Sequence, residues 1–202
     1  MGPRRYAFPI IFVATAIALF AGGACSLPDG DQSSPTQLHY KWVKVRAAGD
    51  LDQMWELLHP DVRSEFERWL TAERLLLNDI KTAYPKEDAA AALEAIGGSA
   101  RGELESPGAL FKLFVRPSPE APGTLGAVSA HVRSEDIAPD GLSATIRTYG
   151  GDEVTFRKGA DGRWYATLAS DEAVRLSNAR NRAEQNLKRV KSNLQKLGRN
   201  QP

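Results

Sequence analysis

The sequence predicts an α+β fold, in which N-terminal helices pack on an antiparallel sheet and a long helix follows at the C-terminus. Apolar residues recur at helical spacing in the first half of the chain and alternate with polar residues between about residues 128 and 168. From residue 171 onward the spacing is helical again. Neither a helical stripe nor one face of a sheet is buried on its own, so the helices are expected to cover the sheet.

The N-terminus has the three parts of an export signal. Arg4 and Arg5 precede an apolar run over residues 10–21, and small residues then lead to Cys25. The run is shorter than the roughly 20 residues that a membrane-spanning helix needs. Cys25 is the only cysteine, which excludes an internal disulfide. We expect residues 1–24 to be removed as a signal peptide.

This N-terminus resembles that of bacterial lipoproteins, in which a cysteine receives lipid and becomes the first residue. Gly23, Ala24 and Cys25 fit that pattern, whereas Gly22 stands where an aliphatic residue is usual. The resemblance implies acyl chains such as palmitate on Cys25 and attachment to a membrane of the cell envelope. Ser26, where related systems often use an aspartate for inner-membrane retention, favours the outer membrane. The alternatives are a secretory signal cut near Ala24 and an uncleaved anchor.

Residues 25–37 are rich in Pro, Gly, Ser and Asp and show no apolar period, which predicts a tether between the lipid and the folded part. Order is expected to begin near Leu38. The folded domain is expected to cover residues 38–170, and a basic amphipathic helix to cover residues 171–202.

Four helices are expected after the tether. Gly49 ends the first helix and Asp50 caps the second. Pro60 fits the first turn of the third, where a missing N–H costs nothing, and Pro85 ends that helix. A short alanine-rich helix over residues 86–96 follows. The apolar stripes of the first three helices consist of Leu38, Trp42, Val45, Leu51, Met54, Trp55, Leu58, Val62, Phe66, Trp69, Leu70, Leu77 and Ile80.

The second half of the chain predicts a sheet. Residues 107–115 are too densely apolar to assign to helix or strand. Alternating apolar and polar side chains then predict half-buried strands at residues 128–133, 142–147, 154–157 and 164–168. Short turns that contain glycine separate these strands, and such turns favour an antiparallel meander of four strands.

Several motifs resemble those of the NTF2-like superfamily, which includes SnoaL-like proteins. They are a small-Gly-Asp entry to a helix in residues 47–52, a Leu-His-Pro-Asp turn in residues 55–62, a strand at 154–157 and a Gly-Arg-Trp hairpin in 161–165. The resemblance spans roughly residues 38–168 and implies a cone-shaped α+β fold with a pocket between helices and sheet. It bears on the fold rather than on an activity.

Some proteins of that superfamily use an aspartate, histidine or tyrosine in the pocket as acid or base. The candidates in this chain are His59, Asp61, Tyr84, His131 and Tyr165. A helix-capping role competes for His59, and a helix-dipole role competes for Asp61. His131 is expected on the face opposite the valines, away from the pocket. We therefore assign no catalytic residue.

The sequence predicts no metal and no cofactor. The histidines form no cluster at ligand spacing and pair with no cysteine. The Gly-Gly pairs at residues 97–98 and 150–151 lack the remainder of a phosphate-binding loop. The four tryptophans are expected in the core.

The C-terminal segment differs in charge from the rest of the chain. From residue 171 onward eight basic residues stand against three acidic ones, a net charge of +5, while residues 26–170 carry −6. An unbroken heptad pattern is formed by Ala173, Leu176, Arg180, Ala183, Leu187, Val190, Leu194 and Leu197. This stripe is expected either to pack on the domain or to pair with a second chain.

The opposite side of that helix is basic. It is formed by Arg182, Lys188, Arg189, Lys191 and Lys196. Anionic lipid headgroups, acidic envelope polymers and the acidic body of a neighbour are possible partners, and the alternative is a solvated polar face.

Two functions are consistent with these patterns. The favoured one is a membrane-anchored envelope lipoprotein whose domain is a non-catalytic binding or assembly module. Its partners would be the membrane, through lipid on Cys25, and a second copy or another envelope protein, through the C-terminal helix. The alternative is a small-molecule isomerase or hydrolase that uses a pocket carboxylate or histidine. Nucleic acid is not expected as a partner, because the protein is predicted to be exported and its body is acidic.

Overall fold

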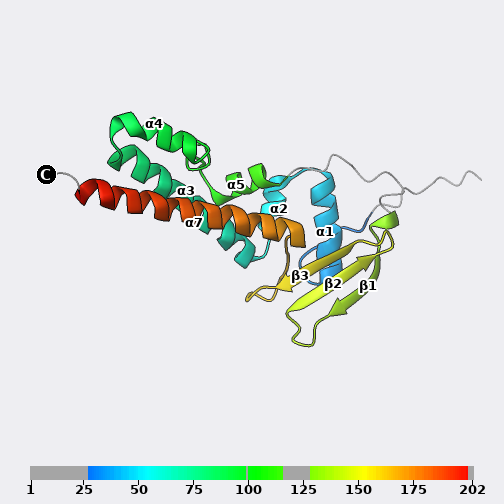
Figure 1. Ribbon diagram of the computed structural model, residues 1–202. Coiled ribbons are helices and arrows are strands. Elements are labelled where there is room, and N and C mark those ends of the chain that lie inside the picture. The colour runs from blue at the N-terminus through cyan, green and yellow to red at the C-terminus, as the bar shows by residue number, and fades with distance from the viewer. Residues whose placement is uncertain (1–26, 99, 116–127, 200–202) are drawn as a thin grey trace, which may run out of the picture.

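The computed structural model describes residues 27–98, 100–115 and 128–199, and the molecule is elongated (Figure 1). A four-stranded sheet with one helix across it lies at one end, and a pair of long helices extends from it toward the other end. The observed class is therefore α+β, as predicted. The predicted signal peptide and Cys25 lie outside the described residues.

The first helix, α1 (Pro35–Ala47), begins three residues earlier than predicted. Ser34 caps it by accepting a hydrogen bond from the backbone N–H of Gln37, and Pro35 occupies the first turn. The Ser-Pro pair carries this start signal, whereas the apolar period alone pointed to Leu38.

The residues before α1 pack on the domain, unlike the free tether that the composition predicted. Leu27 is buried, and the backbone N–H of Trp164 donates to the carbonyl of Gln32 at 3.0 Å. Lys44 of α1 contacts Asp29 at 2.5 Å. The segment from Leu27 to Ser34 is thus held by a strand and by a helix. Long-range contacts of this kind leave no periodic signal in a short polar segment.

The next helices follow the predicted boundaries. They are α2 (Leu51–Leu57), α3 (Pro60–Ala83) and α4 (Lys86–Ala95). Gly49 has a φ of 67°, which glycine adopts without strain, and Asp50 caps α2 through the N–H of Gln53. The ambiguous apolar segment forms a helix, α5 (Pro107–Phe114), capped by Ser106.

The sheet consists of β1 (Val132–Ile137), β2 (Ser143–Thr148), β3 (Glu153–Lys158) and β4 (Trp164–Ala166). Neighbouring strands are antiparallel and lie in the order β1-β2-β3-β4, which confirms the predicted meander.

The prediction for the first strand was wrong in position. Val128 and Ser129 lie in a helical turn, and the strand runs from Val132 to Ile137 rather than over residues 128–133. β1 is an edge strand whose side chains are mostly exposed, so its sequence is charged rather than alternating.

A helix covers one face of the sheet, as predicted. Helix α1 crosses this face (Figure 1), and the buried side chains beneath it include Ala144, Ile146 and Phe156. The prediction that several N-terminal helices cover the sheet was too broad, because α3 packs mainly on the C-terminal helix. Five aromatic side chains form a cluster within the main core: Trp55, Phe66, Trp69, Phe111 and Phe114.

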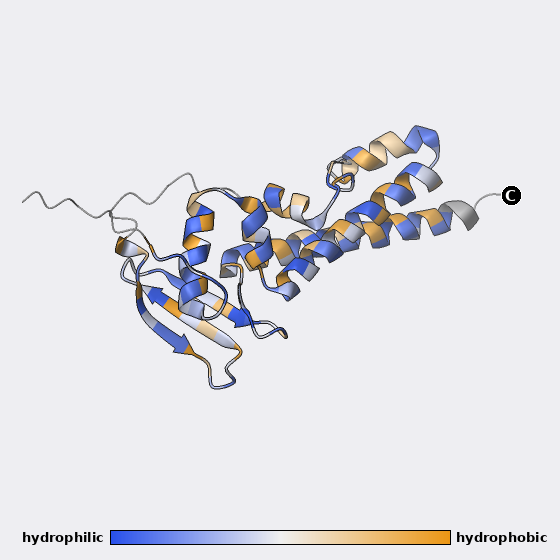
Figure 2. Ribbon diagram, turned by 180° about the vertical axis from the view of Figure 1, so that it is seen from behind, coloured by the Kyte–Doolittle hydropathy of each residue, from blue (hydrophilic) through white to orange (hydrophobic). Residues whose placement is uncertain are grey.

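The C-terminal helix, α7 (Ser170–Arg199), lies side by side with α3. Leu176, Ala183 and Val190 of the predicted heptad stripe are buried, and Val190 packs with Leu76 and Ile80 of α3. Hydrophobic and hydrophilic positions alternate along both helices (Figure 2). The sequence left open whether the stripe packs on the domain or pairs with a second chain, and the structure shows it packed on the chain's own domain. No helix in the described ranges is long and apolar enough to cross a membrane.

Candidate functional site

Of the five candidate acid or base residues, His59, Asp61 and Tyr165 are brought together, and His59 is the buried member of this group. It precedes α3, and its Nδ1 accepts a hydrogen bond from the N–H of Asp61 at 3.2 Å. The ring proton therefore lies on Nε2. Burial is the main reason why the pKa of His59 lies below its usual value. His59 caps a helix, and its own backbone N–H donates to the carbonyl of Ala166 in β4 at 2.9 Å.

The carboxylate of Asp61 is exposed and paired. Its Oδ2 lies 2.9 Å from the guanidinium of Arg157 on β3 and 3.5 Å from Nδ1 of His59. Asp61 also stands in the first turn of α3, where a negative charge is stabilised by the helix dipole. The ion pair of Asp61 with Arg157 thus links the start of α3 to β3.

The phenol of Tyr165 also has a hydrogen-bond partner. Its hydroxyl donates to Asp161 at 2.6 Å, and this bond raises the pKa of Tyr165 and lowers the pKa of Asp161. The ring packs edge-on against His59 at 6.0 Å between centroids. The cluster of His59, Asp61 and Tyr165 therefore joins the start of α3 to the β3-β4 hairpin.

The other two candidates lie elsewhere. Tyr84 follows α3, and its hydroxyl accepts a bond from Asn193 of α7 at 3.3 Å. His131 precedes β1 and packs edge-on against Tyr40. Neither residue belongs to the cluster around His59.

A buried histidine, His39 of α1, was not among the candidates. Its Nε2 donates to the carbonyl of Ala130 at 2.8 Å, while its Nδ1 is buried without a partner in the described part of the chain. Burial is the largest cause that lowers its pKa. The ring packs edge-on against Phe156 of the sheet. His39 lies four residues after Pro35 and three before Trp42, a helical spacing that places it on the same side of α1 as these two residues and could have identified it as a buried position.

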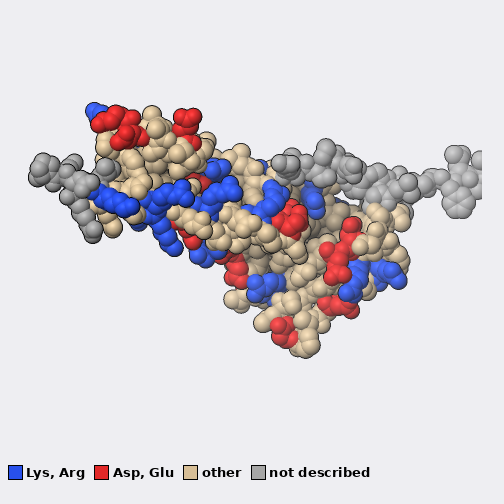
Figure 3. All heavy atoms as spheres, in the orientation of Figure 1, with Lys and Arg blue, Asp and Glu red and all other residues tan. Residues whose placement is uncertain are grey.

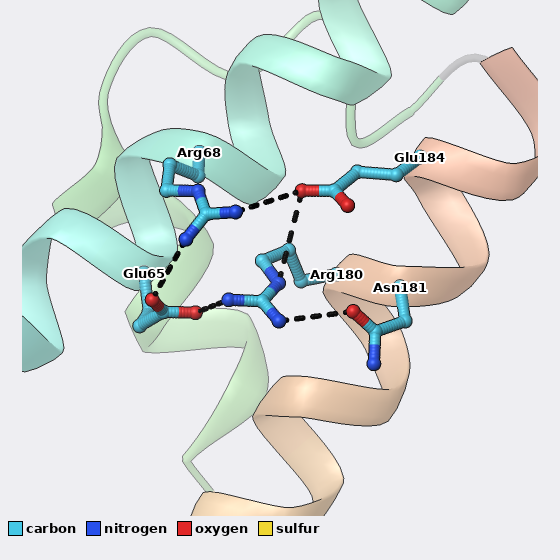
Figure 4. Close-up of polar contacts among 5 residues, drawn as sticks. All are labelled: Glu65, Arg68, Arg180, Asn181 and Glu184. Atoms are coloured by element: carbon cyan, nitrogen blue, oxygen red, sulfur yellow. Dashed lines mark hydrogen bonds and ion pairs between the residues drawn. The ribbon is translucent and has the colours of Figure 1, made fainter. Parts of the chain in front are cut away.

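The helix pair contains a charged network where the heptad stripe is interrupted (Figure 4). Arg180 of α7 pairs with Glu65 of α3, and Arg68 of α3 contacts Glu184 of α7 at 3.4 Å. Arg180 also donates to Asn181 at 2.9 Å. Its Nε lies 3.8 Å from Glu184, which is ion-pair distance but too long for a hydrogen bond. The network links α3 and α7 through two ion pairs between the helices.

The outer side of α7 is basic, as the sequence predicted. Figure 3 shows lysine and arginine side chains gathered along this helix. The predicted basic residues are all exposed: Arg182, Lys188, Arg189, Lys191 and Lys196.

In the described part of the chain, no group of three or more His, Cys, Asp or Glu side chains is placed to hold a metal ion. No family model matches the chain, and no curated protein or solved structure compared with it matches either.

Proposed function

We propose that this chain is a bacterial envelope lipoprotein, anchored through lipid on Cys25, whose domain acts as a non-catalytic binding or assembly module. The observation that carries the proposal is a sequence pattern typical of an export signal, which leads to the only cysteine of the sequence. Several acyl chains on one cysteine make attachment stable, because each buried CH₂ contributes about 0.8 kcal/mol. Ser26 favours the outer membrane.

The packing near the N-terminus supports an anchor at this position. Leu27 is buried in the domain, so a single residue, Ser26, separates it from Cys25. Lipid on Cys25 would therefore hold the folded domain directly at the bilayer surface. A domain held in this way is suited to contacts with the membrane or with proteins in it.

The candidate acid and base residues are occupied by hydrogen bonds and ion pairs within the fold, which supports a binding or assembly module rather than an enzyme. His59 accepts a backbone hydrogen bond, Asp61 is paired with Arg157, and the hydroxyl of Tyr165 donates to Asp161. The first and third contacts are local, and the ion pair of Asp61 with Arg157 joins α3 to β3. We also infer a relationship to the NTF2-like superfamily, supported by the sequence motifs and compatible with helices that precede a four-stranded antiparallel sheet.

The proposal is tested by growing bacteria that express the full chain with an alkyne analogue of palmitate. The wild-type protein is expected to carry the label and to sediment with membranes. The variant Cys25→Ser is expected to lose the label, and the neighbouring variant Ser26→Ala is expected to keep it. An unlabelled wild-type protein, or equal labelling of Cys25→Ser, contradicts the proposal.

A further inference from the structure

The exposed side of α7 carries a row of basic residues with the same period as its buried stripe. Arg182, Arg189 and Lys196 follow at intervals of seven residues, and all three are exposed. Ala183 and Val190, which are buried against α3, have the same spacing. Because both sets repeat every seven residues, the basic row (Arg182, Arg189 and Lys196) keeps one position relative to α3.

The basic row is not neutralised by the domain. Within the described residues, the side chains of Arg182, Arg189 and Lys196 form no ion pair and no hydrogen bond. Glu184, the one acidic residue in this half of α7, is held by Arg68 and Arg180. Residues 182–199 include six basic residues and one acidic residue, a net charge of +5.

The shape of the row indicates what it binds. Its 14-residue length corresponds to about 21 Å along the helix, and its exposed side chains project from the outside of a helix, which is convex. Figure 3 shows basic side chains along α7. A straight row on a convex surface fits a flat array of negative charges rather than a small anion, which needs converging donors.

We propose that the basic row binds the anionic phospholipid headgroups of the bilayer that holds the anchor. This inference rests on the proposed lipidation of Cys25, which would place the domain at that surface. Electrostatic attraction acts within about 8 Å at physiological salt, so a domain kept close to the bilayer is in range. The lipid would hold the end of the molecule near Leu27, and the row would lay α7 along the membrane.

The test uses a chain that begins at Ser26, which contains every described contact and carries no lipid. Its binding is measured by flotation with vesicles of phosphatidylglycerol and phosphatidylethanolamine, and with vesicles of phosphatidylcholine alone. We expect binding to the anionic vesicles that weakens as salt rises. The triple variant Arg182→Gln, Arg189→Gln, Lys196→Gln is expected to bind about 100-fold more weakly, because each basic side chain contributes about fivefold.

The matched control removes the same charge from other places. Arg46, Lys86 and Arg133 are exposed and form no ion pair within the described residues, and they lie on α1, α4 and β1. The triple variant Arg46→Gln, Lys86→Gln, Arg133→Gln is expected to bind much like the wild type. Circular dichroism checks that both variants are folded.

Equal weakening of both variants would overturn the proposal, since net charge rather than the row would then explain binding. No binding of the wild type to anionic vesicles, or equal binding to phosphatidylcholine, would also overturn it, even if an acidic protein bound α7. The vesicle test uses unlipidated protein, so its failure leaves the anchor proposal standing. If the wild-type chain carries no palmitate label, the anchor proposal fails, but the result of the vesicle experiment is unaffected.

Discussion

Arg180 of α7 forms an ion pair with Glu65 of α3 at the one position of the C-terminal heptad stripe that is not apolar. The side chain of Arg180 is 16% exposed and that of Glu65 is 33% exposed. The pair thus lies at the edge of the seam between the two helices, where it is partly shielded from water. Removing one partner leaves the other charge with less solvation than it has in the unfolded chain.

The variant Arg180→Ala is therefore expected to lower the free energy of unfolding by about 2 kcal/mol, less than for a fully buried pair. The double variant Arg180→Met, Glu65→Met replaces both charges by apolar side chains and is expected to leave stability unchanged or higher. Urea denaturation followed by circular dichroism measures both, with Arg182→Ala as an exposed, unpaired control. If Arg180→Ala matches the wild type, the network does not hold the two helices together.

Glu73 of α3 is a buried acceptor for two donors. Its Oε1 accepts from Trp69 Nε1 and from Arg101 Nε, both at 3.0 Å. Glu73→Ala leaves the indole N–H without a partner and should lower the free energy of unfolding by about 2 kcal/mol. Glu73→Gln keeps an acceptor and should cost less. The exposed Glu67 of the same helix provides the control variant Glu67→Ala, which is expected to have little effect in the same urea titration.

Gly30 approaches α1 too closely for any other residue. A Cβ at this position would lie 1.9 Å from the carbonyl oxygen of Gln37. Gly30→Ala is therefore expected to displace the segment from Leu27 to Ser34. Hydrogen exchange of its backbone amides should become faster, while exchange in β2 stays slow. The control is Gly108→Ala, whose Cβ would meet Trp55 at an ordinary 3.6 Å. Unchanged exchange in Gly30→Ala would show that the segment is not docked in solution.

Two buried histidines predict a pH dependence of stability. Burial lowers the pKa of both His39 and His59 below the ordinary 6.5, so the folded state favours their neutral forms. In the unfolded chain each histidine takes up a proton near pH 6.5, which the folded chain does not bind until lower pH. The contribution of these two histidines to the free energy of unfolding is therefore fully present above pH 6.5. It is lost as the pH falls from 6.5 toward the lowered pKa values.

The loss reaches at most about 1.4 kcal/mol per pH unit for each histidine. Urea denaturation between neutral and mildly acidic pH measures it. In His39→Gln the slope of stability against pH should be smaller, and in the double variant with His59→Gln it should be smaller still. The same slope in the wild type and the double variant would contradict this assignment.

The sequence was most informative where local chemistry sets the structure. Pro60, Pro85 and the Asp50 cap defined helix boundaries correctly, because each acts through its own backbone geometry or a nearby N–H. The turns of the meander were predicted for the same reason. The heptad stripe of α7 was also recognised, although its period did not reveal whether the partner was α3 or a second chain.

Features that depend on distant contacts were missed. The segment from Leu27 to Ser34 is held by Trp164, far away in sequence, so its composition resembled a tether. The first strand was misplaced because β1 is an exposed edge with charged residues, whereas the alternating Val128 and Ala130 precede it. His59 and Tyr165 were among the candidates that the sequence offered, and the fold places them together with Asp61.

The central claim is that lipid on Cys25 anchors the chain, and the most direct test is the intact mass of the protein extracted from bacterial membranes with detergent. We expect a chain that begins at Cys25 and carries a diacylglyceryl group and further acyl mass, all of it on the N-terminal fragment. A mass that matches the unmodified full chain, or an unlipidated chain cut near Ala24, would contradict the account.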